Sequence, residues 1–425
     1  MRKLRRPLGL AVAALAVAAS LAPSLAACGS GASSDGTTTL HVVGWKGGGA
    51  EPANVAQINA AFQKSHPKIK LDFSYVPPND VYQQKIQSQL LAGNAADVVM
   101  VDPQKVQIWG KSGYFADLGQ RSWAASISPA VKSFVSYQDK VLASPMELSP
   151  VGVYVNLDIL AKAGVTAPPT DFPAFLAALG KLKAAGQPGY SFPDAQGYMA
   201  EFVMLMSAAT TVYQDNPNWD QQFLQGKVTF PQSFREPLQQ IQQLGTNGYV
   251  DFKNAVGTDE ATTGQPDFLA GKSAFFAGGS WSAAALKKAP FKLAFVPWPG
   301  GKVGVKPSAL LFPGTMWAVN ARSSQQDAAK QYVDFWSSSQ NLAPYLSAEV
   351  AISPFGASTA GADPLLATMA DAYATKRFAL FPTNTWNLAA PETKIRSILQ
   401  NFLLGKADVT ATLTAIQNAA KPANS

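Results

Sequence analysis

The sequence predicts an α/β fold divided into two lobes. Strand and helix patterns alternate from residue 39 to residue 101, which is the arrangement of a parallel sheet with right-handed crossovers. About 390 residues follow the amino-terminal leader, whereas one hydrophobic core rarely organises more than about 250–300 residues. We therefore expect a second core, and with it a second lobe.

The first elements of the chain show the two periodicities of regular structure. Residues 39–45 form a β-rich run, and apolar residues then recur at helical spacing between positions 55 and 62. Residues 69–75 alternate apolar and polar side chains, as in a strand with one solvated face. These patterns predict strand, helix and strand in that order.

A second helix and a buried strand complete this unit. Residues 80–93 begin with a capping Asp and end at a Gly, and residues 97–101 are almost entirely apolar. Because the carboxyl ends of parallel strands meet at one edge, this edge should carry Trp45, Lys46 and Asp102. Open α/β sheets bind ligands at that edge.

The rest of the chain continues with helical and strand patterns, and no internal repeat is found. We expect helices around 175–182, 234–241, 365–373, 395–404 and 409–420, and short strands at 293–296 and 315–319. Trp317 falls in one of these strands and Trp336 on a helix face, so both are expected in the core.

The amino terminus has the order of a secretory signal. Basic residues at 2–6 precede an apolar run at 8–22, which is too short to span a membrane as a mature helix. The run ends at Leu25-Ala26-Ala27-Cys28, which resembles the lipobox of bacterial lipoproteins, and Cys28 is the only cysteine. The resemblance implies a signal peptide at 1–27, lipid (palmitate) on the Cys28 thiol, and a protein anchored outside the cytoplasmic membrane. General secretion is expected, because Pro7 interrupts any twin-arginine signature.

The charge of the chain bears on its possible partners. The formal net charge of the chain is +7, and residues 1–27 carry four of its cations and no acid, so the mature chain has a charge of +3. This balance, without a basic run, gives no reason to expect nucleic acid as a partner. The small polar residues at 28–38 are expected to form a flexible tether.

The chain lacks the familiar motifs of catalysis and metal binding. Gly271-Lys272-Ser273 looks like the end of a P-loop, but the position of the required first glycine is Pro266. His41 and His66 have no Cys or His neighbour at ligand spacing, so we expect no metal and no cofactor. No nucleophile elbow or zinc-protease motif occurs.

A set of short segments, in order along the chain, points to a known family. The segments are 62–67, 85–93, 113–118, 152–160, 268–276, 279–281 and 328–336. Together they resemble the extracellular solute-binding proteins of ABC importers, the group that includes maltose- and other sugar-binding proteins. The resemblance covers nearly the whole mature chain.

The resemblance implies a two-lobed periplasmic-binding-protein fold of type II, with a mainly parallel sheet flanked by helices in each lobe and a hinge of several crossovers. It implies a monomer that captures a carbohydrate, with an oligosaccharide as the expected ligand, and delivers it to the membrane subunits of a permease without altering it. The expected segments are 39–152 and 298–337 for the first lobe, and 153–297 and 338–425 for the second.

Candidate ligand contacts on the first lobe follow from the sheet edge. Trp45 and Lys46 end the first strand, and Asp102 ends the third. An aromatic ring suits the C–H face of a sugar, and planar polar groups suit its hydroxyls. Trp45 could instead cover the sheet edge, and Asp102 could cap the following helix.

Further candidates come from the crossover and from the second lobe. Glu147 precedes the expected crossover strand, where the family often places a polar contact, although a solvated acid fits equally. The resemblance places an aromatic platform at Trp281 and a late stacking aromatic at Trp386, whose alternative role is packing between helices. Trp219 lies on an apparent loop. The remaining candidates, Asn384 and Asn387, flank Trp386 as hydroxyl partners.

Two other classes of function stay open at this point. A secreted glycoside hydrolase would need two carboxylates facing each other across the cleft. A sensor or adhesive lipoprotein could use the same fold to report to a membrane kinase or a host surface.

Overall fold

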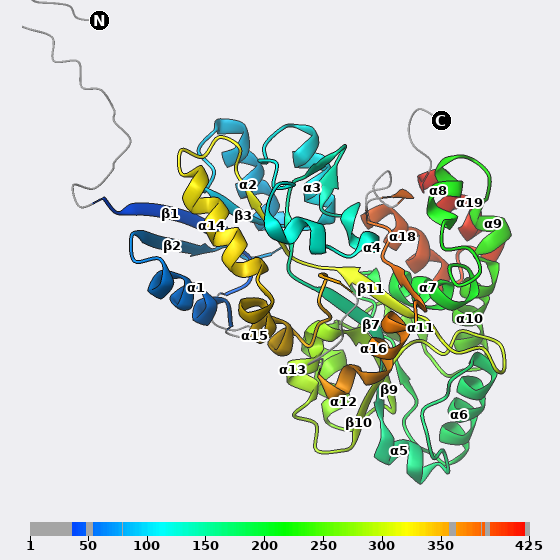
Figure 1. Cartoon of the computed structure of the whole chain (residues 1–425). Coiled ribbons are helices and arrows are strands. Elements are labelled where there is room, and N and C mark those ends of the chain that lie inside the picture. The colour runs from blue at the N-terminus through cyan, green and yellow to red at the C-terminus, as the bar shows by residue number, and fades with distance from the viewer. Residues whose placement is uncertain are drawn as a thin grey trace, which may run out of the picture.

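A mixed five-stranded sheet forms the centre of the first lobe (Figure 1). Its strands are β1 (Thr38–Gly44), β2 (Ile69–Tyr75), β3 (Val98–Val101), β6 (Ser144–Pro145) and β12 (Met316–Val319), in the order β2-β1-β3-β12-β6. β1 pairs in parallel with β2 and β3, whereas β12 runs antiparallel to β3 and β6. The computed structural model describes residues 36–47, 54–78, 80–356, 363–383, 385–386 and 392–420.

The helices of the first lobe follow its strands as the sequence predicts. They are α1 (Asn54–Ser65), α2 (Asp80–Ala92), α3 (Pro103–Lys111), α4 (Pro129–Lys132), α14 (Gln326–Ser337) and α15 (Ser339–Glu349). A small hairpin of β4 (Ser136–Tyr137) and β5 (Lys140–Val141) packs beside α3. The expected strand, helix, strand, helix and strand of residues 39–101 are thus confirmed. Because β1 and β3 are parallel, Trp45 and Asp102 follow strands that end at the same edge.

A six-stranded sheet forms the second lobe. Its path is β13-β11-β7-β9-β8, and β10 pairs with β7 beside that path. The strands are β7 (Leu148–Asn156), β8 (Tyr190–Ser191), β9 (Phe275–Gly279), β10 (Leu293–Val296), β11 (Ala309–Pro313) and β13 (Phe378–Leu380). β7 is antiparallel to β9, β10 and β11, so the sheet is mixed rather than mainly parallel as expected. An apolar run such as β7 shows that both faces are buried, but it does not show the direction of the neighbouring strands.

Helices cover both faces of the second sheet. They are α5 (Leu157–Lys162), α6 (Phe172–Ala184), α7 (Tyr198–Thr211), α8 (Trp219–Leu224), α9 (Phe230–Ser233), α10 (Arg235–Thr246), α11 (Phe252–Ala255), α12 (Gln265–Leu269), α13 (Ala283–Leu286), α16 (Ala367–Ala374), α18 (Glu392–Leu403) and α19 (Val409–Ala420). All nine residues of β7 are buried. Val151, Val153 and Val155 join the core with α6, α7 and α10, while Tyr154 joins the core on the other face. This division follows from the alternation of side chains along a strand.

The chain passes between the lobes at other residues than expected. β7 belongs entirely to the second sheet, so the first passage lies at Glu147 and Leu148 rather than at 152. β11 also belongs to that sheet, which moves the second passage from 297 to Gly314. α15 packs against α1 and α14 of the first lobe, which moves the third passage from 337 to about Val350. Each boundary depends on pairing between distant segments, which local sequence patterns do not contain.

The three passages lie against one another. Leu148 forms a bridge with Ile352, and Met146 donates its backbone N–H to the carbonyl of Thr315 at 2.9 Å. β7 and β11 run side by side through the middle of the molecule (Figure 1). We call residues 146–148, 313–315 and 350–352 the crossing segments. Of the helices that the structure describes, none is long and apolar enough to cross a membrane.

Candidate functional site

A buried polar cluster ties the crossing segments together. The Lys46 ammonium donates to Glu147 Oε1 at 2.9 Å, to the Tyr345 hydroxyl at 2.9 Å and to Glu349 Oε2 at 2.7 Å. Glu147 Oε1 also accepts from the backbone N–H and the hydroxyl of Thr315, at 3.2 and 3.0 Å. One cation therefore joins the end of β1 to the first crossing segment and to α15, which leads into the third.

The electrostatics of this cluster keep Lys46 charged. Burial alone would lower the pKa of Lys46, but Glu147, Tyr345 and Glu349 together raise it well above its usual value. Lys46 and Glu147, which are expected to contact ligand, pair with each other at the crossing segments. Glycine is required at Gly314, because a Cβ there would overlap the Glu147 side chain.

The first-lobe edge carries Trp45 and a charged pair. Trp45 is half-buried and meets the ring of Tyr82 edge to face, with 4.8 Å between centroids. The Lys105 ammonium lies 5.5 Å from the centroid of the Trp45 ring and forms an ion pair with Asp102. Asp102 also accepts the Lys105 backbone N–H at 2.8 Å, so it caps α3, which was its alternative role. Trp45 and Lys105 remain the groups of this edge that suit a ligand.

Trp281 follows the end of β9 in the second sheet. β9 ends at Gly279, which is paired with Val151 of β7. The side chain of Trp281 is 41% exposed, although most large aromatic side chains of the described residues are buried. Its ring covers the backbone of Gly279, because a Cβ at that position would overlap the indole. The glycine at position 279 therefore leaves the space that the Trp281 indole ring occupies.

A chain of aromatic rings supports Trp281. The ring centroid of Phe202 lies 5.8 Å from that of Trp281, Phe381 lies 5.4 Å from Phe202, and Phe312 lies 5.3 Å from Phe381. Phe202 and Phe381 are buried, while Phe312 is partly exposed. We call these four residues the aromatic patch. Since Phe312 is paired with Ser149 of β7, the patch also adjoins the first crossing segment.

The buried carboxylate of Glu260 lies behind the aromatic patch. It accepts hydrogen bonds from the Tyr198 hydroxyl and from the Ser282 hydroxyl at 3.2 Å. Glu260 is only 5% exposed, and burial raises its pKa above the usual value despite these hydrogen bonds. Glu260 begins a π-helical turn (Glu260–Gly264) whose first turn is capped by Asp259.

Trp219 and Trp386 lie in the core of the second lobe, which corrects their expected role as ligand contacts. They are 1% and 0% exposed, and both pack edge to face against Phe230, each with 4.9 Å between ring centroids. The Trp386 indole donates to Asp220 at 2.8 Å. Neither ring offers a face to a ligand. This agrees with the alternative of packing between helices for Trp386.

Some expected features lie outside the described residues. They are the signal at 1–27, the lipidation site Cys28 and the asparagines Asn384 and Asn387.

Sequence reasoning missed several residues of these sites. Glu260 and Tyr198 are separated by 62 positions, and Glu349 follows Lys46 by 303 positions, so no local pattern joins them. A signal was present for Lys105, because it follows Asp102 by one helical turn and such pairs interact.

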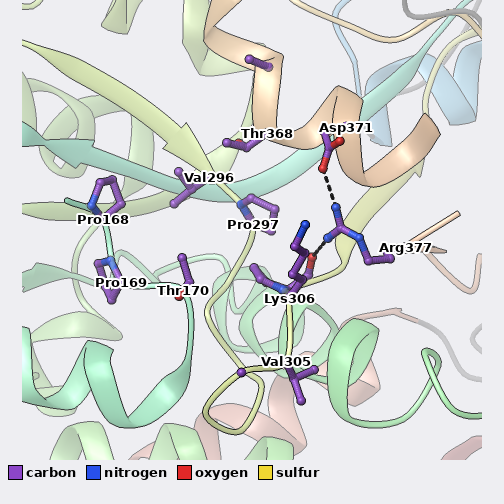
Figure 2. A pocket seen from close by; sticks show the side chains of 13 residues that line it. Pro168, Pro169, Thr170, Val296, Pro297, Val305, Lys306, Thr368, Asp371 and Arg377 are labelled. Atoms are coloured by element: carbon purple, nitrogen blue, oxygen red, sulfur yellow. Dashed lines mark hydrogen bonds and ion pairs between the residues drawn. The ribbon is translucent and has the colours of Figure 1, made fainter. Parts of the chain in front are cut away.

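A groove of about 640 Å³ lies elsewhere on the second lobe, between the end of β10 and α16 (Figure 2). Four prolines line it, and Arg377 at its side pairs with Asp371 at 2.5 Å and with the Pro307 carbonyl at 2.6 Å. No aromatic residue is among its lining groups, and prolines provide no backbone N–H. The groove is therefore a poorer match for a sugar than the aromatic patch is, despite its volume.

Comparison with known proteins shows the family to which the chain belongs. The sequence matches the family described as bacterial extracellular solute-binding protein over residues 57–376. The chain therefore belongs to this family of extracellular solute-binding proteins.

Particular relatives are similar over all or part of the chain. A Brucella abortus (strain 2308) protein, named as a binding protein, is 27% identical over 139 residues, which cover 32% of this chain and 34% of that protein. The chain thus spans about a third of the length of this relative. The diacetylchitobiose binding protein DasA of Streptomyces coelicolor is 27% identical over 348 residues, 76% of each chain.

Solved structures share the two-lobed fold. RafE in complex with raffinose has a TM-score of 0.74 at 21% identity, with 90% of this chain and 99% of that chain covered. The GacH receptor of Streptomyces glaucescens, solved without ligand and with acarbose, has a TM-score of 0.71 at 20% identity, covering 90% and 97%.

Proposed function

We propose that this protein is the substrate-binding component of an ABC importer and that it captures a carbohydrate between its lobes. Membership of the solute-binding family supports the class. The names of similar proteins, which mention diacetylchitobiose, raffinose and acarbose, support a carbohydrate and an oligosaccharide in particular.

The observation that carries the proposal is the exposed indole of Trp281 on the aromatic patch. An indole offers a flat apolar surface that suits the C–H face of a sugar ring. Trp281 follows Gly279, which pairs with Val151 near the start of β7, and Trp45 lies next to Lys46, which binds Glu147 of the first crossing segment. Each lobe therefore offers an aromatic ring near the hinge, and closure of the lobes would bring such surfaces around a ligand.

The proposed mechanism is capture without chemistry. Ligand binding shifts the population from open toward closed lobes, because the closed form makes contacts from both sides. The permease then recognises the closed form, and its ATPase resides on other chains. The polar cluster of Lys46, Glu147 and Glu349 holds the crossing segments together while the lobes move.

The ligand is found by a thermal-shift screen against a panel of carbohydrates that includes diacetylchitobiose, raffinose and maltotriose. A ligand that binds only the folded state raises the melting temperature, by an amount that grows with its concentration over Kd. A panel without any stabilising sugar would contradict the carbohydrate assignment. Release of product from a chromogenic glycoside would instead favour a hydrolase.

Transport is tested separately from binding. Deletion of the gene should abolish initial uptake of the labelled sugar identified by the screen. Unchanged uptake would indicate a sensor or adhesive role for the same binding site.

We also propose that Cys28 carries the lipid anchor of the mature protein. The variant Cys28→Ser should release the protein from the membrane fraction or leave its precursor uncleaved, since it removes the lipidated thiol. Fractionation that matches the wild type would contradict lipidation.

A further inference from the structure

We propose that the groove between β10 and α16 is a second ligand site, which takes an aliphatic monocarboxylate such as a fatty acid. Its volume of about 640 Å³ falls within the range of small-molecule sites in proteins, about 300–1,000 Å³. Among the described residues, those that line the groove belong neither to the aromatic patch nor to the crossing segments. The site therefore goes beyond the proposed function and does not depend on it.

Prolines make the walls of the groove apolar and poor in hydrogen-bond donors. Pro168 and Pro169 come from the segment between α5 and α6, whereas Pro297 and Pro307 come from the two ends of the loop between β10 and β11. Proline has a fixed φ angle and no backbone N–H. Val305 adds an aliphatic side chain to the same loop. Such walls suit a hydrocarbon chain, whereas a sugar would leave most of its hydroxyls without partners against them.

The loop between β10 and β11 is held in place from inside the second lobe. The ring of Trp298 is fully buried, and its indole donates to Gln240 Oε1 at 3.0 Å. The Gln240 amide donates in turn to the carbonyl of Gly300 at 2.7 Å. The backbone N–H of Phe172, at the start of α6, donates to the carbonyl of Gly301 at 2.9 Å. The groove is therefore formed in advance, so a ligand would bind without the cost of ordering this loop.

The charged groups of the groove leave one positive charge without a partner. Arg377 donates to Asp371 at 2.5 Å and to the Pro307 carbonyl at 2.6 Å, so the charge of Asp371 is already balanced (Figure 2). Lys306 also lines the groove, and its ammonium forms no hydrogen bond or ion pair with any residue that the structure describes. One unpaired ammonium beside aliphatic walls matches a ligand with one carboxylate and an apolar tail, since charge-assisted hydrogen bonds are the stronger ones.

The test uses decanoate as the probe and decanol as its neutral counterpart of the same chain length. We expect calorimetry to show decanoate binding to the purified protein, and decanol binding more weakly. Lys306→Met keeps an aliphatic side chain and removes the charge. It should weaken decanoate binding about tenfold, the loss that corresponds to one charge-assisted hydrogen bond, and leave decanol binding unchanged. Equal affinity of wild type and Lys306→Met for decanoate would overturn the role of Lys306.

A matched control exists in the same loop. Lys302 is exposed like Lys306, but it does not line the groove. Lys302→Met makes the same change of charge and should bind decanoate like the wild type. Equal losses in the two variants would show that the general charge of the loop attracts the anion, which would contradict the proposed site.

A third variant tests the groove itself. Ala367 is exposed at the start of α16 and lines the groove, so Ala367→Trp fills it without disturbing the core. This variant should lose binding of both probes. Wild-type binding by Ala367→Trp, or no decanoate binding by the wild type, would overturn the proposal.

Competition separates the groove from the proposed sugar site. A saturating amount of the sugar found by thermal shift should leave the affinity for decanoate unchanged. Displacement of decanoate by the sugar would place both in one site and contradict a second one. If the wild type bound no sugar of the panel, the proposed function would fail, while Lys306→Met and Ala367→Trp would still decide the role of the groove.

Discussion

The second lobe contains two tryptophans in different settings. In the interior, Asp220 accepts from the Trp386 indole at 2.8 Å and from the Tyr213 hydroxyl at 2.7 Å. Near Trp281, the buried Glu260 accepts instead from the Tyr198 hydroxyl and from the hydroxyl of Ser282, the residue after Trp281. The two tryptophans also differ in exposure, because Trp386 is 0% exposed and Trp281 is 41% exposed.

The difference shows that exposure separates a structural tryptophan from a candidate for binding. Phe230 of α9 covers Trp386, whereas Trp281 lies on Gly279 and Phe202 with one side open. The Trp386 indole is also tied to a carboxylate in the core.

The largest expected effect is on stability. Trp386→Ala should lower the free energy of unfolding by about 3–5 kcal/mol, because it removes a fully buried ring and leaves a cavity. Trp281→Ala should lower it by about 1 kcal/mol or less, since its ring is partly solvated. Urea unfolding of both variants measures this. Equal losses would show that the two tryptophans have the same structural role.

The second effect is on binding. Trp281→Ala should weaken binding of the sugar by about 1–3 kcal/mol, as expected for loss of a stacked aromatic ring. Trp386→Phe keeps a ring in the core and serves as the control, with affinity expected to match the wild type. Calorimetry of the two variants checks the prediction, and unchanged affinity in Trp281→Ala would remove that residue from the site.

The smallest effect is on the pH dependence of stability. Burial raises the pKa of Asp220 to about 6, although Tyr213 and Trp386 donate to it. A carboxyl whose pKa is raised by folding stabilises the protein at low pH, and this contribution is lost as the pH rises through about 6. Between pH 7 and pH 5 the wild type should gain about 1 kcal/mol relative to Asp220→Asn, which cannot ionise. Parallel pH profiles of urea unfolding would contradict the raised pKa.

Much of the fold was predictable from local patterns. Period-two and helical spacing placed β1, α1, β2, α2 and β3, because each of these elements buries one face or stripe on its neighbours. The parallel pairs then brought Trp45 and Asp102 to one edge. These features depend on residues close together in sequence.

The candidate site was less predictable because its contacts are long-range. Lys46 was predicted from its place after the first strand and Glu147 from its place before the crossover strand. The bonds from Lys46 to Glu349 and Tyr345 of α15 could not be predicted in this way. Trp386 was predicted to contact ligand, but Phe230, about 150 positions earlier in the chain, packs against its ring. Motifs place a tryptophan near the site, and only tertiary packing decides whether its face is free.

The central claim is that a sugar lies between the lobes against Trp281. A crystal structure of the protein with the sugar found by thermal shift tests it most directly. We predict a sugar ring stacked on Trp281, with first-lobe residues on the other side of the ligand. A sugar in the proline-lined groove, or on one lobe without contact to Trp281, would contradict it.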